Sequence, residues 1–293
     1  MRVLAAPSSL KGVLSARDAA EALARGLRAG GADAVEMPVA DGGDGTLDVL
    51  ASAALRREAN VAAPLGGTVT ASWALRDDGT AIVESAEALG FQTVSSLDPV
   101  RASSRGLGEL IVVAARDAES LLVCLGGTVT VDGGAGMREV LDELPLPARV
   151  ACDVLAPLLD AVYVFASQKG THEEDFDALA ARLRGLPDLP GAGAAGGLGG
   201  AFAALGAELV PGAQLVLDEL GFDPAGYDLV VTGEGAVDET TWLGKAPGEV
   251  VRRSREAGVR CELFSARDDL SGDPSRAQED LVALGERLAC ELA

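Results

Sequence analysis

The chain has 293 residues, which is long for one compact domain and about right for two. Its 45 acidic residues outnumber its 24 Lys and Arg residues, and the resulting formal net charge of −21 disfavours nucleic acid and anionic membranes as partners. Apolar residues make up 48% of the chain and charged residues 24%, which is typical of an ordinary soluble globule. Aromatic residues, at 3%, are too few for the stacking surfaces of single-strand binders, so small ligands remain.

The amino-terminal part of the chain alternates between strand and helix patterns. We expect a strand at Arg2–Ala6, a helix at Ser15–Ala29 and a strand at Val35–Ala40, which together form one βαβ unit. A helical pattern follows at Leu47–Leu55. Short Thr- and Val-containing segments separated by glycine turns then predict hairpin strands. These strands are Ala59–Ala63, Thr68–Leu75 and Thr80–Glu84.

The alternating pattern returns after the hairpins, which predicts a second domain inserted into the first. The further expected helices are Ser104–Arg116, Ala135–Glu143, Glu173–Leu183, Ala194–Ala207, Gly248–Glu256 and Gln278–Leu292. The further expected strands are Ser120–Leu125, Tyr163–Ala166, Tyr227–Thr232 and Arg260–Phe264.

Four loops combine glycine with carboxylate or hydroxyl side chains, and three of them follow a predicted strand, the position where open α/β sheets bind ligands. Glycine lets backbone N–H groups approach an anion, the next helix adds its positive end, and carboxylates beside the loop can hold Mg²⁺. Together the loops predict a nucleotide-phosphate site, while a tight strand-to-helix turn is the alternative for any one of them. They are Ala40–Thr46, Gly126–Gly134, Gly191–Gly197, and Thr232–Gly235 with Asp238.

Several other chemistries are excluded at the level of their motifs. The Gly191-x-Gly193-x-x-Gly196 spacing lacks the preceding strand that a dinucleotide fingerprint needs, so NAD binding is not predicted. The sequence has no Walker-type phosphate loop and no G-x-S-x-G nucleophile turn, and His172 is its single histidine. Carboxylates, lysines and a metal remain. This set suits phosphoryl transfer, where positioning and charge neutralisation carry most of the catalysis.

Two acids and one glycine loop are the first candidates for that chemistry. Asp41 and Asp44 follow a predicted strand and precede a helix. An acid beside anionic nucleotide phosphates is favourable only if it holds a metal or takes a proton from the attacking hydroxyl. We assign Asp41 as metal ligand or base and Asp44 as the alternate, with a helix N-cap as the structural alternative for Asp44. The Gly126–Gly134 loop is assigned to the nucleotide phosphates.

Fixed positive charge is scarce near these loops. A protein of net charge −21 that transfers a phosphoryl group needs local cations where that group moves. Lys11 follows the first strand, and Lys245 precedes a late helix. If the two chain ends pair in one sheet, both lysines reach the same cleft. A solvated surface lysine is the alternative for each.

Glycine- and acid-containing motifs occur in a characteristic order along the chain. They are Ala6–Gly12, Ala40–Thr46, Gly126–Gly136, Ala151–Val154, Gln168–Gly170, Pro190–Leu198, Thr232–Gly235 and Gly244–Pro247. In this order and approximate spacing they resemble the bacterial glycerate kinases of the first type. The resemblance implies ATP-dependent phosphorylation of D-glycerate, or a related small hydroxy acid, with Mg²⁺, by a two-domain α/β enzyme.

The resemblance also guides the domain arrangement and the site residues. It implies a Rossmann-like parallel-sheet domain from both chain ends, placed at residues 1–60 and 225–293, with an inserted α/β domain, containing some hairpin strands, at 61–224. The predicted catalytic residues are Asp41, Lys11 and Asp44, and the predicted metal ligands are Asp41 and Asp132. The predicted nucleotide-binding residues are Gly126, Gly127, Thr128, Thr130, Gly133, Gly134, Gly193 and Gly196. The predicted substrate-binding residues are Ser9, Lys11, Glu234, Asp238 and Lys245.

The chain departs from the family pattern at polar loop positions. Ser8 stands in place of an acid, Val131 of an asparagine, Ala236 of an arginine and Leu243 of a histidine. The alternative to a kinase is therefore a family relative that binds nucleotide or hydroxy acid as a regulatory protein without turnover. A nucleotide-independent isomerase or lyase is a third reading. Because the first residues run directly into a strand pattern, we expect a cytoplasmic protein, either monomer or homodimer, and either glycerate hydroxyl as acceptor.

Overall fold

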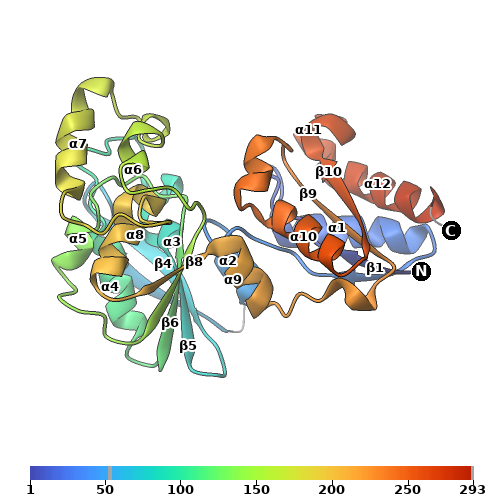
Figure 1. Cartoon of the computed structure of the whole chain (residues 1–293), viewed down its shortest axis with the longest axis horizontal. Helices are drawn as coiled ribbons and strands as arrows, with labels where there is room; N and C mark the ends of the chain where they lie inside the picture. The colour runs from blue at the N-terminus through green and yellow to red at the C-terminus, as the bar shows by residue number, and fades with distance from the viewer. Residues whose placement is uncertain (52–54, 292–293) are drawn as a thin grey trace. The chain divides into compact units, whose positions relative to one another are not determined.

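The computed structural model describes residues 1–51 and 55–291, and the chain divides into two compact units (Figure 1). The first unit comprises Met1–Asp41, Asp48–Leu50 and Val216–Ala293, and the second comprises Gly42–Leu47 and Ala51–Leu215. Each unit contains helices and its own sheet. The predicted fold class, two α/β parts of which one is built from both chain ends, is therefore confirmed.

The sheet of the first unit is parallel throughout and has the strand order β10-β9-β1-β2. β1 pairs with β9, with Val3 opposite Leu229, so the blue and the orange-to-red ends of the chain in Figure 1 share one sheet. All four strands therefore present their carboxyl ends at the same edge. The strands are β1 (Arg2–Ala5), β2 (Asp33–Glu36), β9 (Leu229–Glu234) and β10 (Arg260–Ser265).

Two helices of the first unit, α1 (Ala16–Ala29) and α12 (Ala277–Glu291), pack against each other through glycine. A Cβ on Gly26 would lie 2.0 Å from the carbonyl oxygen of Val282, and one on Gly285 would lie 2.5 Å from that of Leu23. Glycine at both contacts lets the helix backbones approach closely. The core joins Val3, Ala5, Leu229 and Val231 of the sheet to Leu23, Leu27, Leu281 and Leu284 of these helices. The unit also contains α10 (Ala246–Glu256) and α11 (Ala266–Asp269).

The sheet of the second unit has six strands in the order β3-β4-β5-β6-β7-β8. The pairings of β4 with β3 and β5 are antiparallel, which confirms the predicted hairpins, and those from β5 to β8 are parallel. The strands are β3 (Arg56–Ala62), β4 (Thr68–Leu75), β5 (Thr80–Glu84), β6 (Ser120–Leu125), β7 (Ala148–Cys152) and β8 (Glu208–Pro211).

The helices of the second unit range from four to eleven residues in length. They include α3 (Ser85–Leu89), α4 (Arg105–Ala114), α5 (Ala135–Arg138), α6 (Asp160–Tyr163), α7 (Phe176–Leu183) and α8 (Ala194–Ala204). The apolar core formed by Leu107, Leu110 and Ile111 of α4 with Val83 of β5 and Val123 of β6 fixes this helix on the sheet. Two further helices, α2 (Thr46–Leu50) and α9 (Gly212–Glu219), contain points where the chain passes from one unit to the other.

The strand predicted at Tyr163–Ala166 is wrong. Tyr163 ends α6, and the side chains of Tyr163 and Val164 are 52% and 57% exposed, so this aromatic and β-branched run does not pair in a sheet. The strand between β6 and β8 is β7 instead, whose small residues carry a weak strand signal. The prediction also missed β8 and α9.

Element ends and unit boundaries differ from the predicted positions. β2 ends at Glu36, before the predicted end at Ala40, although the N–H groups of Met37 and Val39 still donate to the Ala5 and Pro7 carbonyl oxygens. The helix predicted at Leu47–Leu55 corresponds to α2, which ends at Leu50. Residues 52–54 of the predicted helix lie outside the described residues. β3 begins before residue 60 and pairs with β4, so it belongs to the second unit, which extends to Leu215.

Candidate functional site

Three neighbouring parallel strands of the second unit end side by side. β5, β6 and β7 are adjacent, with Glu84 opposite Cys124 and Leu125 opposite Cys152. The residues that follow these strands therefore meet at the carboxyl edge of the sheet, where α/β proteins bind ligands. They are Ser85, Gly126 and Asp153.

The loop after β6 is closely flanked by two carboxylate residues. A Cβ on Gly126 would lie 2.5 Å from Asp153 Oδ2, and a Cβ on Gly127 would lie 2.8 Å from the Cβ of Asp44. Gly127 also has a φ of +66°, which a side chain rarely adopts. Within this unit, no hydrogen bond of the described residues uses the backbone N–H of Gly127 or Thr128. The loop thus keeps two donors available for an anion.

A buried lysine supplies positive charge to the same loop. The Lys169 side chain lies at the end of a 3-10 turn, Ser167–Lys169, and the residue is 5% exposed. Its Nζ donates to Thr128 Oγ1 at 3.3 Å and to the Thr130 carbonyl oxygen at 2.9 Å. Burial lowers the pKa of Lys169 to about 8, while the charges of Asp153 and Asp132 oppose this shift.

Thr130 adds an unused polar group beside Lys169. Its Oγ1 is buried and has no hydrogen-bond partner among the described residues, which is costly unless a ligand or water satisfies it. Such an orphaned hydroxyl fits a site that is completed by a polar ligand.

Glu84 holds the Gly42–Leu47 segment. Its carboxylate accepts hydrogen bonds from the backbone N–H groups of Gly45 at 2.9 Å and Leu47 at 2.7 Å. Burial raises the pKa of Glu84 to about 8, the two N–H groups oppose this rise, and the charges of Asp44 and Glu87 add to it.

The other predicted nucleotide-binding glycines make internal contacts. The N–H of Gly133 donates to the Gly196 carbonyl, and that of Gly193 donates to the Ala156 carbonyl. A Cβ on Gly196 would lie 2.0 Å from the Thr130 carbonyl oxygen. These glycines allow backbone segments to pack closely, which favours a structural role. Their predicted nucleotide contacts stay predictions.

Asp132 also makes internal contacts. One carboxylate oxygen accepts from Ser104 N, Ser104 Oγ and Gly136 N, and the other accepts from Gly134 N. These bonds join the starts of α4 and α5 and occupy most of the lone pairs of the carboxylate. They favour a structural role, and the prediction that Asp132 binds metal remains untested.

A second charged cluster lies at the carboxyl edge of the sheet in the first unit. Glu234 ends β9 and accepts hydrogen bonds from Thr241 Oγ1 at 2.6 Å and Lys245 Nζ at 2.9 Å. The loop after β1 lies beside β9, because the N–H of Ser8 donates to the Gly233 carbonyl at 2.9 Å. This loop continues through the half-buried Ser9 to the exposed Lys11.

Asp41 belongs to this cluster and accepts a hydrogen bond from the backbone N–H of Ala246, the first residue of α10. Burial raises the pKa of Asp41; the Ala246 N–H opposes the rise, Glu234 adds to it, and Lys11 and Lys245 oppose it. The structure therefore brings together four of the predicted site residues of the first unit, which are Lys11, Asp41, Glu234 and Lys245.

Asp238 has a capping role at the edge of the cluster. It accepts hydrogen bonds from the N–H and hydroxyl of Thr240, which lower the pKa of Asp238, and begins the 3-10 turn Glu239–Leu243. All predicted substrate-binding residues lie in the first unit and all predicted nucleotide-binding residues in the second.

Sequence reasoning missed four residues at the edge of the second sheet, Glu84, Ser85, Asp153 and Lys169. Asp153 lies in the family motif Ala151–Val154, but it was not chosen as a site residue because no strand was predicted directly before it. Lys169 was visible in a family motif, but its burial against the Gly126 loop depends on tertiary contacts that the motif does not contain.

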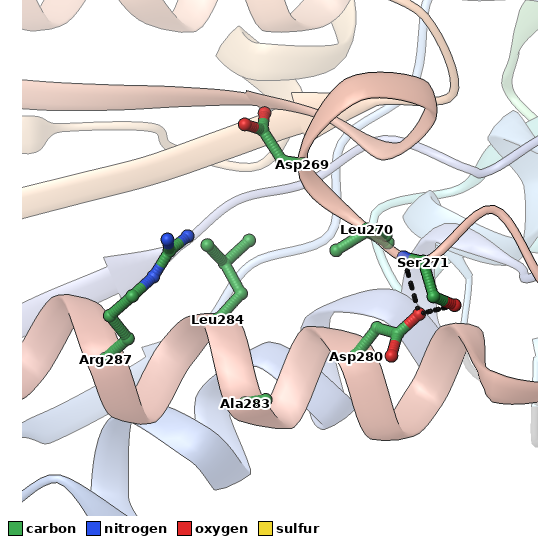
Figure 2. A pocket seen from close by; sticks show the side chains of 7 residues that line it. All are labelled: Asp269, Leu270, Ser271, Asp280, Ala283, Leu284 and Arg287. Carbon is green, nitrogen blue, oxygen red and sulfur yellow. Dashed lines mark hydrogen bonds between the residues drawn. The ribbon is translucent and has the colours of Figure 1, made fainter.

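A pocket of about 220 Å³ in the first unit lies elsewhere, between α12 and the segment Asp269–Ser271 (Figure 2). Asp280 at one end accepts hydrogen bonds from the N–H and hydroxyl of Ser271. The residues that line it include none of the candidate site residues, so we assign it no role.

In residues 1–51 and 55–291 there is no group of three or more His, Cys, Asp or Glu side chains that could hold a metal. Mg²⁺ often binds through one or two carboxylates and substrate phosphates, and the carboxylates of Asp44 and Asp153 beside the Gly126 loop fit that mode. None of the described helices has the length and apolar character of a membrane span.

Comparison with known proteins identifies the family. Residues 3–144 and 144–281 match the glycerate kinase family. The chain is 37% identical over 305 residues to the glycerate 2-kinase of Escherichia coli K12, covering 84% of this chain and 80% of the relative. It is 36% identical over 317 residues to the glycerate kinase of Bacillus subtilis 168, covering 88% and 83% respectively. A solved Salmonella typhimurium LT2 structure named glycerate kinase 2 matches with a TM-score of 0.82 and 31% identity, covering 100% of this chain and 98% of that one. The chain therefore belongs to the glycerate kinase family.

Proposed function

We propose that this protein transfers a phosphoryl group from ATP to D-glycerate. The observation that carries the proposal is the loop Gly126–Thr128, which keeps two backbone N–H groups unused and has a carboxylate residue on either side. The named functions of the relatives give the substrate. The regulatory relative without turnover receives no support from these comparisons.

In the second unit, we assign the N–H groups of Gly127 and Thr128 to the nucleotide phosphates. Lys169 keeps a positive charge against the loop below pH about 8, which offsets phosphate charge. Asp44 and Asp153 would hold Mg²⁺, which when bound neutralises charge on the phosphates and orients them.

In the first unit, we assign Lys11 and Lys245 to the glycerate carboxylate, since both are cations close enough to affect Asp41. We assign Asp41 as the base that takes the proton from the attacking hydroxyl. Its raised pKa favours that role, because a carboxylate with raised pKa is a stronger proton acceptor. Glu234 keeps Lys245 in place through the ion pair at 2.9 Å.

The acceptor hydroxyl and the cellular setting belong to the same proposal. Because the Escherichia coli relative is named a glycerate 2-kinase, we infer that the 2-hydroxyl is the acceptor. The cytoplasmic location, the absence of nucleic-acid partners and the monomeric or homodimeric state stay predictions.

An ADP-release assay across small hydroxy acids tests the proposal. The purified protein with Mg-ATP is expected to release ADP with D-glycerate and at much lower rates with lactate, glycolate and glycerol, which lack either the second hydroxyl or the carboxylate. Equal low rates with all four compounds, together with tight nucleotide binding, would instead support a binding protein.

A further inference from the structure

Two loops of the second unit, Gly42–Leu47 and Gly126–Thr128, contact each other backbone to backbone. A Cβ on Gly43 would lie 3.0 Å from the Cα of Gly126, and a Cβ on Gly126 would lie 2.7 Å from the Cα of Gly43. Side chains at these positions would separate the loops. Because Asp44 follows Gly43 directly, the contact determines how far its carboxylate lies from Gly127.

Glu84 fixes the first loop from below. It ends β5, is 2% exposed, and accepts the N–H groups of Gly45 and Leu47 with its two carboxylate oxygens. Gly45 has a φ of +85°, so the turn that carries Asp44 adopts a conformation that side chains disfavour. The two hydrogen bonds that Glu84 accepts hold the turn in that conformation.

Ser85, the next residue, fixes the second loop. Its Oγ donates to the Gly126 carbonyl oxygen at 3.0 Å and accepts the Gly126 N–H at 3.1 Å. The side chain is fully buried, so no solvent competes for these bonds. Consecutive residues of one strand end thus bind both loops, and the rigid sheet sets the spacing between them.

We propose that Glu84 and Ser85 are a positioning pair that places the Asp44 carboxylate against the Gly127 turn, so that Mg²⁺ and the nucleotide phosphates are bound together. The proposal rests on the phosphoryl-transfer function above and assigns roles to two residues that touch neither substrate. Its specific consequence is that the pair determines how strongly Mg²⁺ increases the affinity for nucleotide. This effect is separate from any contribution of the two residues to the stability of the fold.

The chain offers a matched control for each residue. Glu87 is also a glutamate, lies three positions from Glu84, and accepts a backbone N–H, that of Ser72, at 2.9 Å. Ser120 forms a hydroxyl–hydroxyl contact with Thr80 at 3.2 Å, away from the loops. Glu84→Gln keeps the shape and one acceptor oxygen, while its new NH₂ group cannot accept the second N–H.

The experiment measures ADP affinity with and without Mg²⁺ by isothermal titration for the wild type, Glu84→Gln, Glu87→Gln, Ser85→Ala and Ser120→Ala. In the wild type, Mg²⁺ is expected to strengthen ADP binding. In Glu84→Gln and Ser85→Ala, Mg²⁺ is expected to strengthen ADP binding much less. Their kcat/KM should fall about 10²-fold, the effect of misplacing a reacting group by about 1 Å. In the two control variants, the effect of Mg²⁺ on ADP affinity and kcat/KM should both stay within about twofold of the wild type, even if their melting temperatures fall.

The outcomes separate this proposal from the function on which it rests. A wild-type gain on adding Mg²⁺ that persists unchanged in Glu84→Gln and Ser85→Ala would overturn the positioning role alone. A wild type that binds Mg-ADP without phosphorylating glycerate would overturn the function, and the titrations would still test the pair. If Glu84→Gln fails to fold, Ser85→Ala with its Ser120→Ala control gives the result.

Discussion

Lys169 Nζ donates to the Thr130 carbonyl oxygen at 2.9 Å, inside the second unit and next to the only loop whose donors we assign to phosphate. The contact places a titrating charge against that loop. Burial lowers the pKa of Lys169 to about 8, so its ammonium is protonated below that pH and loses charge above it.

We therefore expect kcat/KM for Mg-ATP to fall as the pH rises through about 8. Lys169→Arg should remove this fall, because a guanidinium stays charged throughout the range, even if its absolute rate is lower. The measurement is the pH profile of kcat/KM for both proteins. Parallel profiles in the wild type and Lys169→Arg would contradict the role of the Lys169 charge.

The stability of the fold should change in the opposite direction. In the unfolded chain Lys169 binds its proton up to its ordinary pKa of 10.5, whereas in the folded chain it releases the proton near 8. Between these values the unfolded state binds more protons, so this residue makes the free energy of unfolding rise with pH. Denaturant titrations of the wild type and Lys169→Met at pH 8 and 10 check the sign, and a Lys169→Met difference that is independent of pH would contradict it.

Asp41→Asn tests the proposed base. The variant retains an oxygen for the Ala246 N–H but cannot take up a proton at neutral pH. We expect kcat to fall by about 10²-fold or more, with little change in melting temperature. A kcat within about threefold of the wild type, well short of the effect of losing a general base, would show that Asp41 only caps α10.

Gly127→Ala and Gly133→Ala separate a ligand loop from a packing contact. Both glycines have positive φ, +66° and +59°, so each substitution adds a similar backbone strain of about 1–2 kcal/mol. The new Cβ meets the Asp44 Cβ at 2.8 Å in the first case and Leu183 Cδ2 at 2.7 Å in the second. Calorimetry should show reduced stability in both variants but weakened ADP binding only in Gly127→Ala. An equal loss of ADP affinity in the two variants would show that Gly133 also contributes to nucleotide binding.

Lys11→Ala and Lys245→Ala test the cations of the first unit. Lys11 is exposed, so its removal should leave stability unchanged while kcat/KM for glycerate falls about 10²-fold, equivalent to ~2.7 kcal/mol. Lys245→Ala should raise KM and also lower stability, because it leaves the buried Glu234 carboxylate without its ion-pair partner. Glu234→Gln in the Lys245→Ala background should recover part of the stability. Unchanged kinetics in both lysine variants would contradict the substrate assignment.

The sequence was sufficient where local patterns carry the structure. Alternation and glycine turns predicted the hairpins from β3 to β5, and the glycine-acid motifs predicted the loop at Gly126 and Gly127. It was insufficient for residues whose role depends on which strands are neighbours. Glu84 has no motif of its own. Only the pairing of β5 with β6 brings Glu84 and Ser85 into hydrogen-bonding contact with the loops Gly42–Leu47 and Gly126–Thr128. The sequence also does not show which backbone N–H groups surround the Asp132 carboxylate, and its predicted metal role stays a prediction.

Phosphorus NMR of a reaction containing the purified protein, Mg-ATP and D-glycerate follows the transfer of a phosphoryl group from ATP to glycerate itself. We expect the ATP signals to be replaced by those of ADP and of a phosphate ester on the 2-oxygen of glycerate. An ATP spectrum that stays unchanged, in a sample where the same protein binds Mg-ADP, would contradict it.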